Sequence, residues 1–438
     1  LPAVSYAGDP SRYRWLDLLP RLGLLWDLTG KGRSLVRAGY AAYGASLGVS
    51  DVSFDNPLAQ SASVSYYWRD KNGNHVVEPG ELDLVRGKLG ASGVDPENPA
   101  AAVSPHRIDP AYRAPRTHEA TLSFEQTLGG ATTTLRGSWR RLLHPRWTPL
   151  RNLTLADYAI RGAATGQLFD QTYSVGYYGP ASESKIVPGN GRLLTNREGY
   201  RQEAFSVELV ARGRVGRRFE GTAWGSLGEW LEFFDDWSRA SQDPTSLDSD
   251  PLQNAGTVAA RPGGLGRSDV FVSSRWTAGA SLRAQLPWRL AVASRVYARD
   301  GFPIPYYQVV GGDPTVGSKN LLVSPRLDTY RVPALVLVDL RLERGFRLGR
   351  GTLVTALDVF NLLNHGTTLQ VTRDVELPAL DRPREIVRPR IARLGLEWRF
   401  SIELGGASVA PPRPPRRYAG VNPAPQRGPS PAKVLPSH

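Results

Sequence analysis

Oxygen-bearing side chains recur at regular spacing in the stretch DKNGNHVVEPGE, from Asp70 to Glu81. Calcium takes six to eight oxygen ligands, and EF-hand loops supply them from positions 1, 3, 5, 7, 9 and 12 of a twelve-residue loop. Here His75 stands where such loops have glycine, so a plain polar loop with a turn at Asn72-Gly73 is the alternative. The calcium ligands expected from the spacing are Asp70, Asn72, Asn74, Val76 through its carbonyl, Glu78 and Glu81.

Other patterns give little support for catalysis. GASLG, Gly44 to Gly48, matches the G-x-S-x-G nucleophile elbow, which needs a strand before the serine and a helix after it. The stretch that follows shows no helical period, and the six histidines are far apart with no H-E-x-x-H. Because the chain has no cysteine, thiolate metal sites and disulfides are excluded. We expect no enzymatic activity and no required cofactor, apart from Ca²⁺ in an outer loop.

Alternating apolar and polar side chains recur along the chain, and this period of two predicts β-strands. The last example is RLGLEWRF, where one face of the predicted terminal strand carries Leu394, Leu396, Trp398 and Phe400. Similar runs form hairpins with short Gly- or Pro-containing turns. The predicted pairs are 21–28 with 34–45, 119–125 with 132–144, 205–212 with 217–231, 275–285 with 290–299, and 336–343 with 352–362.

Long polar segments separate these hairpins, at about 69–116, 145–200, 235–268, 300–332 and 365–388. Strands of about ten residues with tight turns at one end and long loops at the other are typical of a transmembrane β-barrel. We therefore predict an all-β, antiparallel transmembrane β-barrel of roughly a dozen strands, part of a larger barrel, with short periplasmic turns and long outer loops. A soluble β-sandwich or propeller is the alternative, since it also alternates apolar and polar residues.

Charged residues fall on the polar faces of the predicted strands. We expect them to face an aqueous lumen and to pair across strands, rather than to act as a glycosidase pair. They are Arg275, Arg283, Asp339, Arg341, Glu343, Arg393, Glu397 and Arg399.

In DGFPIPYY, two prolines stop strand pairing beside three aromatic residues, which predicts either an interfacial anchor or a ligand contact. These aromatic residues are Phe302, Tyr306 and Tyr307.

The net charge of +13 invites a nucleic-acid interpretation, but the basic residues are scattered singly and form no basic helix. We expect no nucleic-acid binding and instead expect contact with outer-membrane lipid and anionic lipopolysaccharide. The stretch 401–438 is rich in Pro and Arg, which predicts a disordered tail after a barrel segment at 1–400. Because the chain has no Met, we expect it to be processed or a fragment, with any signal peptide upstream of Leu1.

Four segments together resemble the C-terminal part of TonB-dependent outer-membrane receptors, particularly the Oar-like group. They are PRLGLLWDLTGKGRSLVRAGYAAY, APRTHEATLSFEQTLGG, VDLRLERGFRLGRGTLVTALDVFNLLNH and RPRIARLGLEWRF. The resemblance implies a barrel of about 22 strands that is occluded by a plug. It also implies TonB as a partner, acting through a plug absent from this chain, and an assembly machinery that reads a terminal aromatic residue.

On this resemblance we expect a cell outer-membrane receptor that binds a scarce small-molecule, glycan or peptide ligand and imports it. The alternative is a passive porin, adhesin or surface scaffold without a plug.

Overall fold

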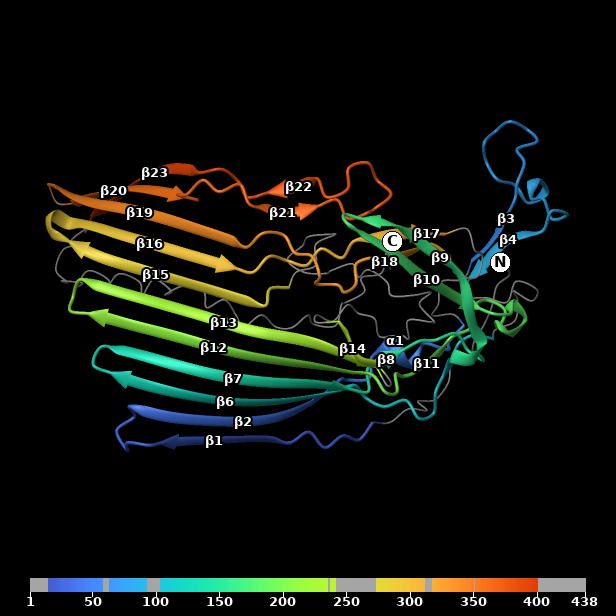
Figure 1. Cartoon of the computed structure of the whole chain (residues 1–438), viewed down its shortest axis with the longest axis horizontal. Coiled ribbons are helices and arrows are strands. Elements are labelled where there is room, and N and C mark those ends of the chain that lie inside the picture. The colour runs from blue at the N-terminus through green and yellow to red at the C-terminus, as the bar shows by residue number, and fades with distance from the viewer. Residues whose placement is uncertain are drawn as a thin grey trace, which may run out of the picture.

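The computed structural model describes residues 15–57, 63–92, 103–234, 237–241, 273–311, 317–349 and 351–400. These ranges fold almost wholly as antiparallel β-structure in two regions (Figure 1). Long strands lie side by side along the long axis, and short elements gather beyond one end of them. The expected tail, 401–438, lies outside the described residues.

The long strands form one sheet of twelve strands, with order β1-β2-β6-β7-β12-β13-β15-β16-β19-β20-β23 and β14 paired to β13. All these pairs are antiparallel, and β1 and β23 are the edges of the described sheet. The expectation of an all-β, antiparallel fold is thus confirmed. The bounds are β1 (Arg21–Asp27), β2 (Ser34–Gly44), β6 (Arg116–Leu128), β7 (Ala131–Leu143), β12 (Arg201–Val215), β13 (Phe219–Phe234), β14 (Trp237–Ser241), β15 (Trp276–Leu286), β16 (Leu290–Arg299), β19 (Leu335–Leu348), β20 (Gly351–Phe360) and β23 (Ile391–Phe400).

The strand register keeps two chemically different faces throughout this sheet. Leu342 lies opposite Leu357, which in turn lies opposite Leu394, so apolar residues meet across neighbouring strands. Because successive side chains alternate in direction, the charged residues of the same strands gather on the other side. We call these the apolar face, which includes Leu22, Leu282 and Leu394, and the polar face, which includes Arg37, Arg283 and Arg393.

Tight turns join the strands at one end of the sheet, as the alternation predicts. The turn between β1 and β2 holds Gly30 at φ 62° and Gly32 at φ 67°, in the left-handed region that glycine enters without strain. Between β15 and β16, the short helix η4 (Pro287–Arg289) makes the turn. Short turns require their two strands to be adjacent and antiparallel, which fixes the register of each hairpin.

The opposite end carries what we call the loop layer, built from the long connections of the sheet (Figure 1). These connections contain short helices, short strands and one hairpin of longer strands, β9 and β10, that the alternation did not predict. They are α1 (Val49–Val52), β3 (Ser63–Tyr66), η1 (Pro79–Glu81), β4 (Lys88–Ser92), β5 (Arg107–Ile108), β8 (Arg146–Trp147), η2 (Leu155–Asp157), β9 (Tyr158–Leu168), β10 (Gln171–Pro180), η3 (Glu183–Lys185), β11 (Leu193–Asn196), β17 (Tyr307–Val310), β18 (Lys319–Leu322), β21 (Thr368–Val371) and β22 (Pro383–Ile386).

The largest cluster of buried apolar residues lies in the loop layer. Side chains from three connections pack there, and Tyr306 is 1 % exposed. The cluster comprises Leu168, Phe302, Ile304, Tyr306, Val323, Val332 and Val371. None of the described helices is long and apolar enough to cross a membrane.

Candidate functional site

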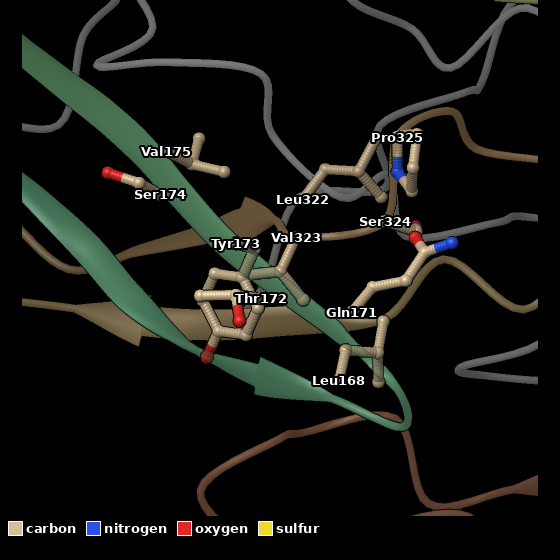
Figure 2. A pocket seen from close by; sticks show the side chains of 10 residues that line it. All are labelled: Leu168, Gln171, Thr172, Tyr173, Ser174, Val175, Leu322, Val323, Ser324 and Pro325. Carbon is tan, nitrogen blue, oxygen red and sulfur yellow. The ribbon is translucent and has the colours of Figure 1, made fainter.

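A hollow of about 320 Å³ opens in the loop layer beside strand β10. One wall is the β9–β10 hairpin, and the other is the segment that follows β18 (Figure 2). The hairpin reverses at Phe169, whose φ of 54° lies in the left-handed region. The lining residues are Leu168, Gln171, Thr172, Tyr173, Ser174, Val175, Leu322, Val323, Ser324 and Pro325.

Hydroxyl and amide groups supply the polar chemistry of this hollow. Tyr173 Oη donates a hydrogen bond to Gln308 Oε1 at 3.1 Å, which joins β10 to β17. Burial, with the Glu376 carboxylate, raises the pKa of Tyr173, so its phenol stays protonated as a donor. Ser324 is 4 % exposed, and its Oγ is buried without a hydrogen-bond partner. No lining residue is ionised at neutral pH, so the hollow suits an uncharged polar group.

The aromatic residues predicted in DGFPIPYY do not form one exposed group. Phe302 and Tyr306 are buried in the loop-layer cluster, and Tyr306 Oη donates to Asp381 Oδ1. Phe169 and Tyr330 stack edge-on against Tyr306, with ring centroids 5.3 and 5.5 Å away. Contacts between distant loops thus bury Phe302 and Tyr306. Their predicted role as an interfacial anchor or a ligand contact stays a prediction.

Tyr307, in contrast, is half-buried, and Arg373 lies over its ring at 5.5 Å. Its expected role in ligand contact stays a prediction.

Charged side chains from four strands, β15, β19, β20 and β23, form ion pairs on the polar face. Asp358 Oδ1 accepts from Arg341 Nη1 at 2.7 Å, and Asp358 Oδ2 accepts from Arg393 Nη2 at 2.7 Å. Arg341 also pairs with Glu343 at 2.6 Å, and Arg283 Nη2 lies 3.9 Å from Glu343 Oε2. Opposite charges on neighbouring strands stabilise their register, as expected from the sequence.

The other predicted polar-face residues have more local partners. Arg399 pairs with Glu397 on the same strand at 2.8 Å. Asp339 Oδ1 accepts the backbone N–H of Asn361 at 3.0 Å, where the chain leaves β20. Arg275 precedes β15 and pairs with Asp300 at 2.9 Å, at the boundary with the loop layer. Whether this face surrounds an aqueous lumen stays a prediction.

The terminal strand β23 presents its apolar residues outward, as the alternation predicts. The exposed fractions are 83 % for Leu394 and 77 % for Leu396, and Trp398 and Phe400 on the same face are also exposed. Because β23 is an edge of the described sheet, only β20 pairs with it.

The predicted calcium loop is an exposed turn that ends at a buried acid. Asp70 accepts the backbone N–H groups of Gly73 at 2.7 Å and His75 at 2.9 Å. Glu81, 5 % exposed, accepts the N–H of Lys71 at 2.9 Å. No cluster of three or more His, Cys, Asp or Glu side chains suited to a metal occurs in the described ranges. The calcium site, with its backbone and amide ligands, stays a prediction.

The GASLG match is followed by a helix after all, because α1 begins directly behind Gly48. This corrects the expectation of a non-helical continuation, although α1 has only four residues. In the described structure Ser46 makes no hydrogen bond to a histidine, so the base that a nucleophile elbow needs is not in place.

Two features of the loop layer were not predicted from the sequence. The β9–β10 hairpin lies inside the stretch that we expected to be a long polar loop, and its TYSVGYYG run was the available strand signal. Three arginines, Arg107, Arg151 and Arg192, meet near β11 from segments far apart in the sequence. No spacing rule connects such distant positions.

No family model matches the chain, and no curated protein matches it. Solved structures similar to it include the FrpB iron transporter from Neisseria meningitidis, with 13% identity and a TM-score of 0.42 over 87% of this chain and 38% of that one. The outer membrane transporter YddB from Escherichia coli has 10% identity and a TM-score of 0.42, over 85% and 39%. The ferric preacinetobactin receptor BauA from Acinetobacter baumannii has 12% identity and a TM-score of 0.40, over 87% and 36%. The chain thus spans about two fifths of the length of these structures.

Proposed function

We propose that this chain is the later part of a β-barrel in an outer-membrane receptor, which captures a scarce solute in its outer loop layer and imports it. The observation that carries the proposal is the apolar face, which runs across the whole sheet and stays exposed, 69 % at Leu22 in β1 and 83 % at Leu394 in β23. Soluble monomers rarely expose so large an apolar patch, whereas a bilayer covers one.

The polar face and the loop layer support the same proposal. Ion pairs such as Arg341–Asp358 need water or protein beside them, so hydrocarbon belongs on the other side. The loop layer lies at one end only, as in barrels with short periplasmic turns and long outer loops (Figure 1). The hollow beside β10 then faces the outside, where a solute arrives.

The proposal includes partners that follow from the sequence resemblance. TonB would act through a plug, and the assembly machinery would read an aromatic residue of the β23 strand. Lipid and lipopolysaccharide would contact the apolar face. The segment from Val338 to His365 and the terminal aromatic strand support the Oar-like group within these receptors.

Membrane embedding can be tested with single-cysteine labels, because the chain has no native cysteine. Leu282→Cys and Arg283→Cys place a fluorophore on the apolar and polar faces at the same depth of β15. We expect a lipid-attached quencher to quench the label at 282 strongly and the label at 283 weakly. Equal quenching at the two positions would exclude hydrocarbon as the medium of the apolar face.

Uptake can be separated from passive passage by electrical recording in planar bilayers. An unplugged porin gives steady ion conductance, whereas a receptor occluded by a plug does not. We expect the complete protein to insert without steady conductance. A constant open conductance would favour the alternative, a passive porin, and would leave the membrane assignment intact.

A further inference from the structure

Three arginines from two connections of the sheet come together in the loop layer, and we call them the arginine cluster: Arg107, Arg151 and Arg192. The register of β5 and β11 sets Arg107 beside Leu193, and the Arg107 N–H donates to the Arg192 carbonyl at 2.9 Å. On the other side of the same segment, the Arg151 N–H donates to the Gly191 carbonyl at 2.8 Å. Three adjacent backbone segments therefore each contribute one guanidinium group.

Hydrogen bonds within the protein leave much of this positive charge uncompensated. Arg107 Nη1 donates to the Ser104 carbonyl at 2.7 Å, and Arg192 Nη1 donates to the Thr148 carbonyl at 2.8 Å. Nε of Arg151 is buried without a hydrogen-bond partner. Across the described ranges, no carboxylate lies within ion-pair distance of these three side chains. Arg107 and Arg192 are exposed, so their remaining donors can reach an incoming group.

Two acidic residues of the same layer, Asp109 and Asp51, are held by other groups. Asp109 accepts from Thr195 Oγ1 at 2.6 Å and from the backbone N–H of Ala111 at 2.8 Å. Asp51 pairs with Arg146 at 3.3 Å. Each of these two acids would therefore have to break an existing bond before it could pair with the arginine cluster.

His106 lies beside the cluster as a neutral ring. Its Nδ1 accepts the backbone N–H of Arg192 at 3.1 Å, which assigns the ring proton to Nε2. Burial, followed by the charges of Arg192 and Arg151, lowers the pKa of His106, so the ring stays neutral at neutral pH. Burial and Arg107 likewise lower the pKa of Arg151, in agreement with a concentrated positive field.

We propose that the arginine cluster is a binding site for a compact polyanion that carries neighbouring phosphate or carboxylate groups. Guanidinium groups form paired, charge-assisted hydrogen bonds with both kinds of group. Such a ligand offsets the mutual repulsion of the three arginines. The inference rests on the proposed function only in placing the site on the outer side of the membrane. The polyanion can be a soluble solute or the phosphates of lipopolysaccharide.

Direct binding measurements on the protein purified in detergent test this site. The probe for a soluble ligand is inorganic pyrophosphate, followed by titration calorimetry. The probe for a lipid source is a vesicle that contains diphosphorylated lipid A, compared with a phosphatidylcholine vesicle. Binding of either probe that requires the cluster supports the proposal, and the stronger of the two identifies the source.

Matched variants decide whether the cluster carries the binding. Arg151→Gln/Arg192→Gln removes two charges from it, and Arg382→Gln/Arg384→Gln removes two exposed charges beside and within β22. We expect the first pair to weaken binding about tenfold or more, because each charge-assisted hydrogen bond contributes on that scale, and the second pair to have little effect.

Equal binding by the wild type and the cluster variant would overturn the proposal, as would equal losses in both double variants. Should Arg151→Gln/Arg192→Gln lose its β-structure by circular dichroism, the exposed Arg107→Gln provides the same comparison. Failure here is distinct from failure of the proposed function, because the quenching experiment at positions 282 and 283 does not depend on anion binding.

Discussion

The sheet and the loop layer bury opposite kinds of side chain. In the sheet, apolar residues such as Leu396 lie outward and exposed, while Asp358 is buried on the polar face. The loop layer instead buries apolar side chains, as a water-soluble protein does. Leu321 is 0 % exposed and Tyr306 is 1 % exposed. If the proposed function is correct, this difference means that one chain is folded for two media. Hydrocarbon fits the outside of the sheet, and water fits the outside of the loop layer.

The comparison predicts that the loop layer depends on its core as a soluble domain does. Tyr306→Ala should lower the free energy that holds the loop layer together by about 3–5 kcal/mol, because it removes a buried aromatic ring. The measurement is protease sensitivity of the loop segments in membrane-embedded protein as urea rises.

The control is Tyr306→Phe, which keeps the ring and loses only the hydrogen bond to Asp381, at a smaller cost of about 1–3 kcal/mol. Heat-dependent gel migration, which reports on the sheet, should stay unchanged in both variants. A loop layer equally resistant in Tyr306→Ala and the wild type would contradict a packed core there.

The sheet, in contrast, should be destabilised by a charge on its apolar face. Leu282→Arg should destabilise the folded protein in a bilayer by about 2–4 kcal/mol, because a guanidinium near the bilayer midplane must leave water. Reversible urea unfolding in lipid vesicles measures this change.

Ser281→Arg is the matched control, one residue away and on the polar face opposite Arg295. Its expected cost is below about 1 kcal/mol, since the added charge stays hydrated and meets only a like charge across the strand. If the two variants cost the same, the two faces of β15 share one medium.

The strands of the sheet could be predicted from the sequence, because two faces with different surroundings impose a two-residue alternation of apolar and polar side chains. The run predicted at 275–285 corresponds to β15 at Trp276–Leu286, and the strand predicted at 290–299 corresponds to β16 at the same bounds. Short turns then require neighbouring strands to pair in chain order. Little long-range information was needed, so local patterns sufficed.

The loop layer was not readable in this way, because its contacts join residues far apart in the chain. Tyr306 is in contact with Phe169 and Asp381, and the positions of these residues in the sequence do not predict either contact. The arginine cluster likewise depends on β5 pairing with β11. In the hairpin β9–β10, small and aromatic residues replace the regular apolar rows of the sheet, so its strands were missed.

Calcium binding should order one segment of the loop layer, the Asp70–Glu81 loop. We predict that Ca²⁺ binds the Asp70–Glu81 loop. At a free Ca²⁺ concentration of ten times the Kd, proteolysis after Lys71 should be about tenfold slower, because the protease cleaves only the open, calcium-free loop. Chelator should restore the original rate. Glu81→Gln should abolish the protection, whereas Asp83→Asn, just outside the twelve-residue spacing, should retain it. Identical cleavage in calcium and chelator would remove the calcium site.

The smallest expected effect is an acid-sensitive contact at the start of β9. Lys185 donates a hydrogen bond to Asp157 Oδ1, and the Thr154 N–H donates to Asp157 Oδ2 at 2.7 Å. These bonds, led by that from Lys185, lower the pKa of Asp157 to about 2 from its ordinary 3.8. A carboxylate whose pKa is lower in the folded state stabilises the fold above the unfolded value and loses this effect as pH falls through the folded value.

We therefore predict that the turn before β9 loosens between about pH 4 and pH 2, while the sheet stays intact. Hydrogen exchange at the Thr154 amide should accelerate over this interval in the wild type. In Asp157→Asn the exchange should be fast already at neutral pH and should show no step, whereas Asp170→Asn, in the exposed turn after β9, should keep the step. A step that persists in Asp157→Asn would assign the acid sensitivity to another group, and an accompanying loss of the sheet would mean that the two regions do not respond independently.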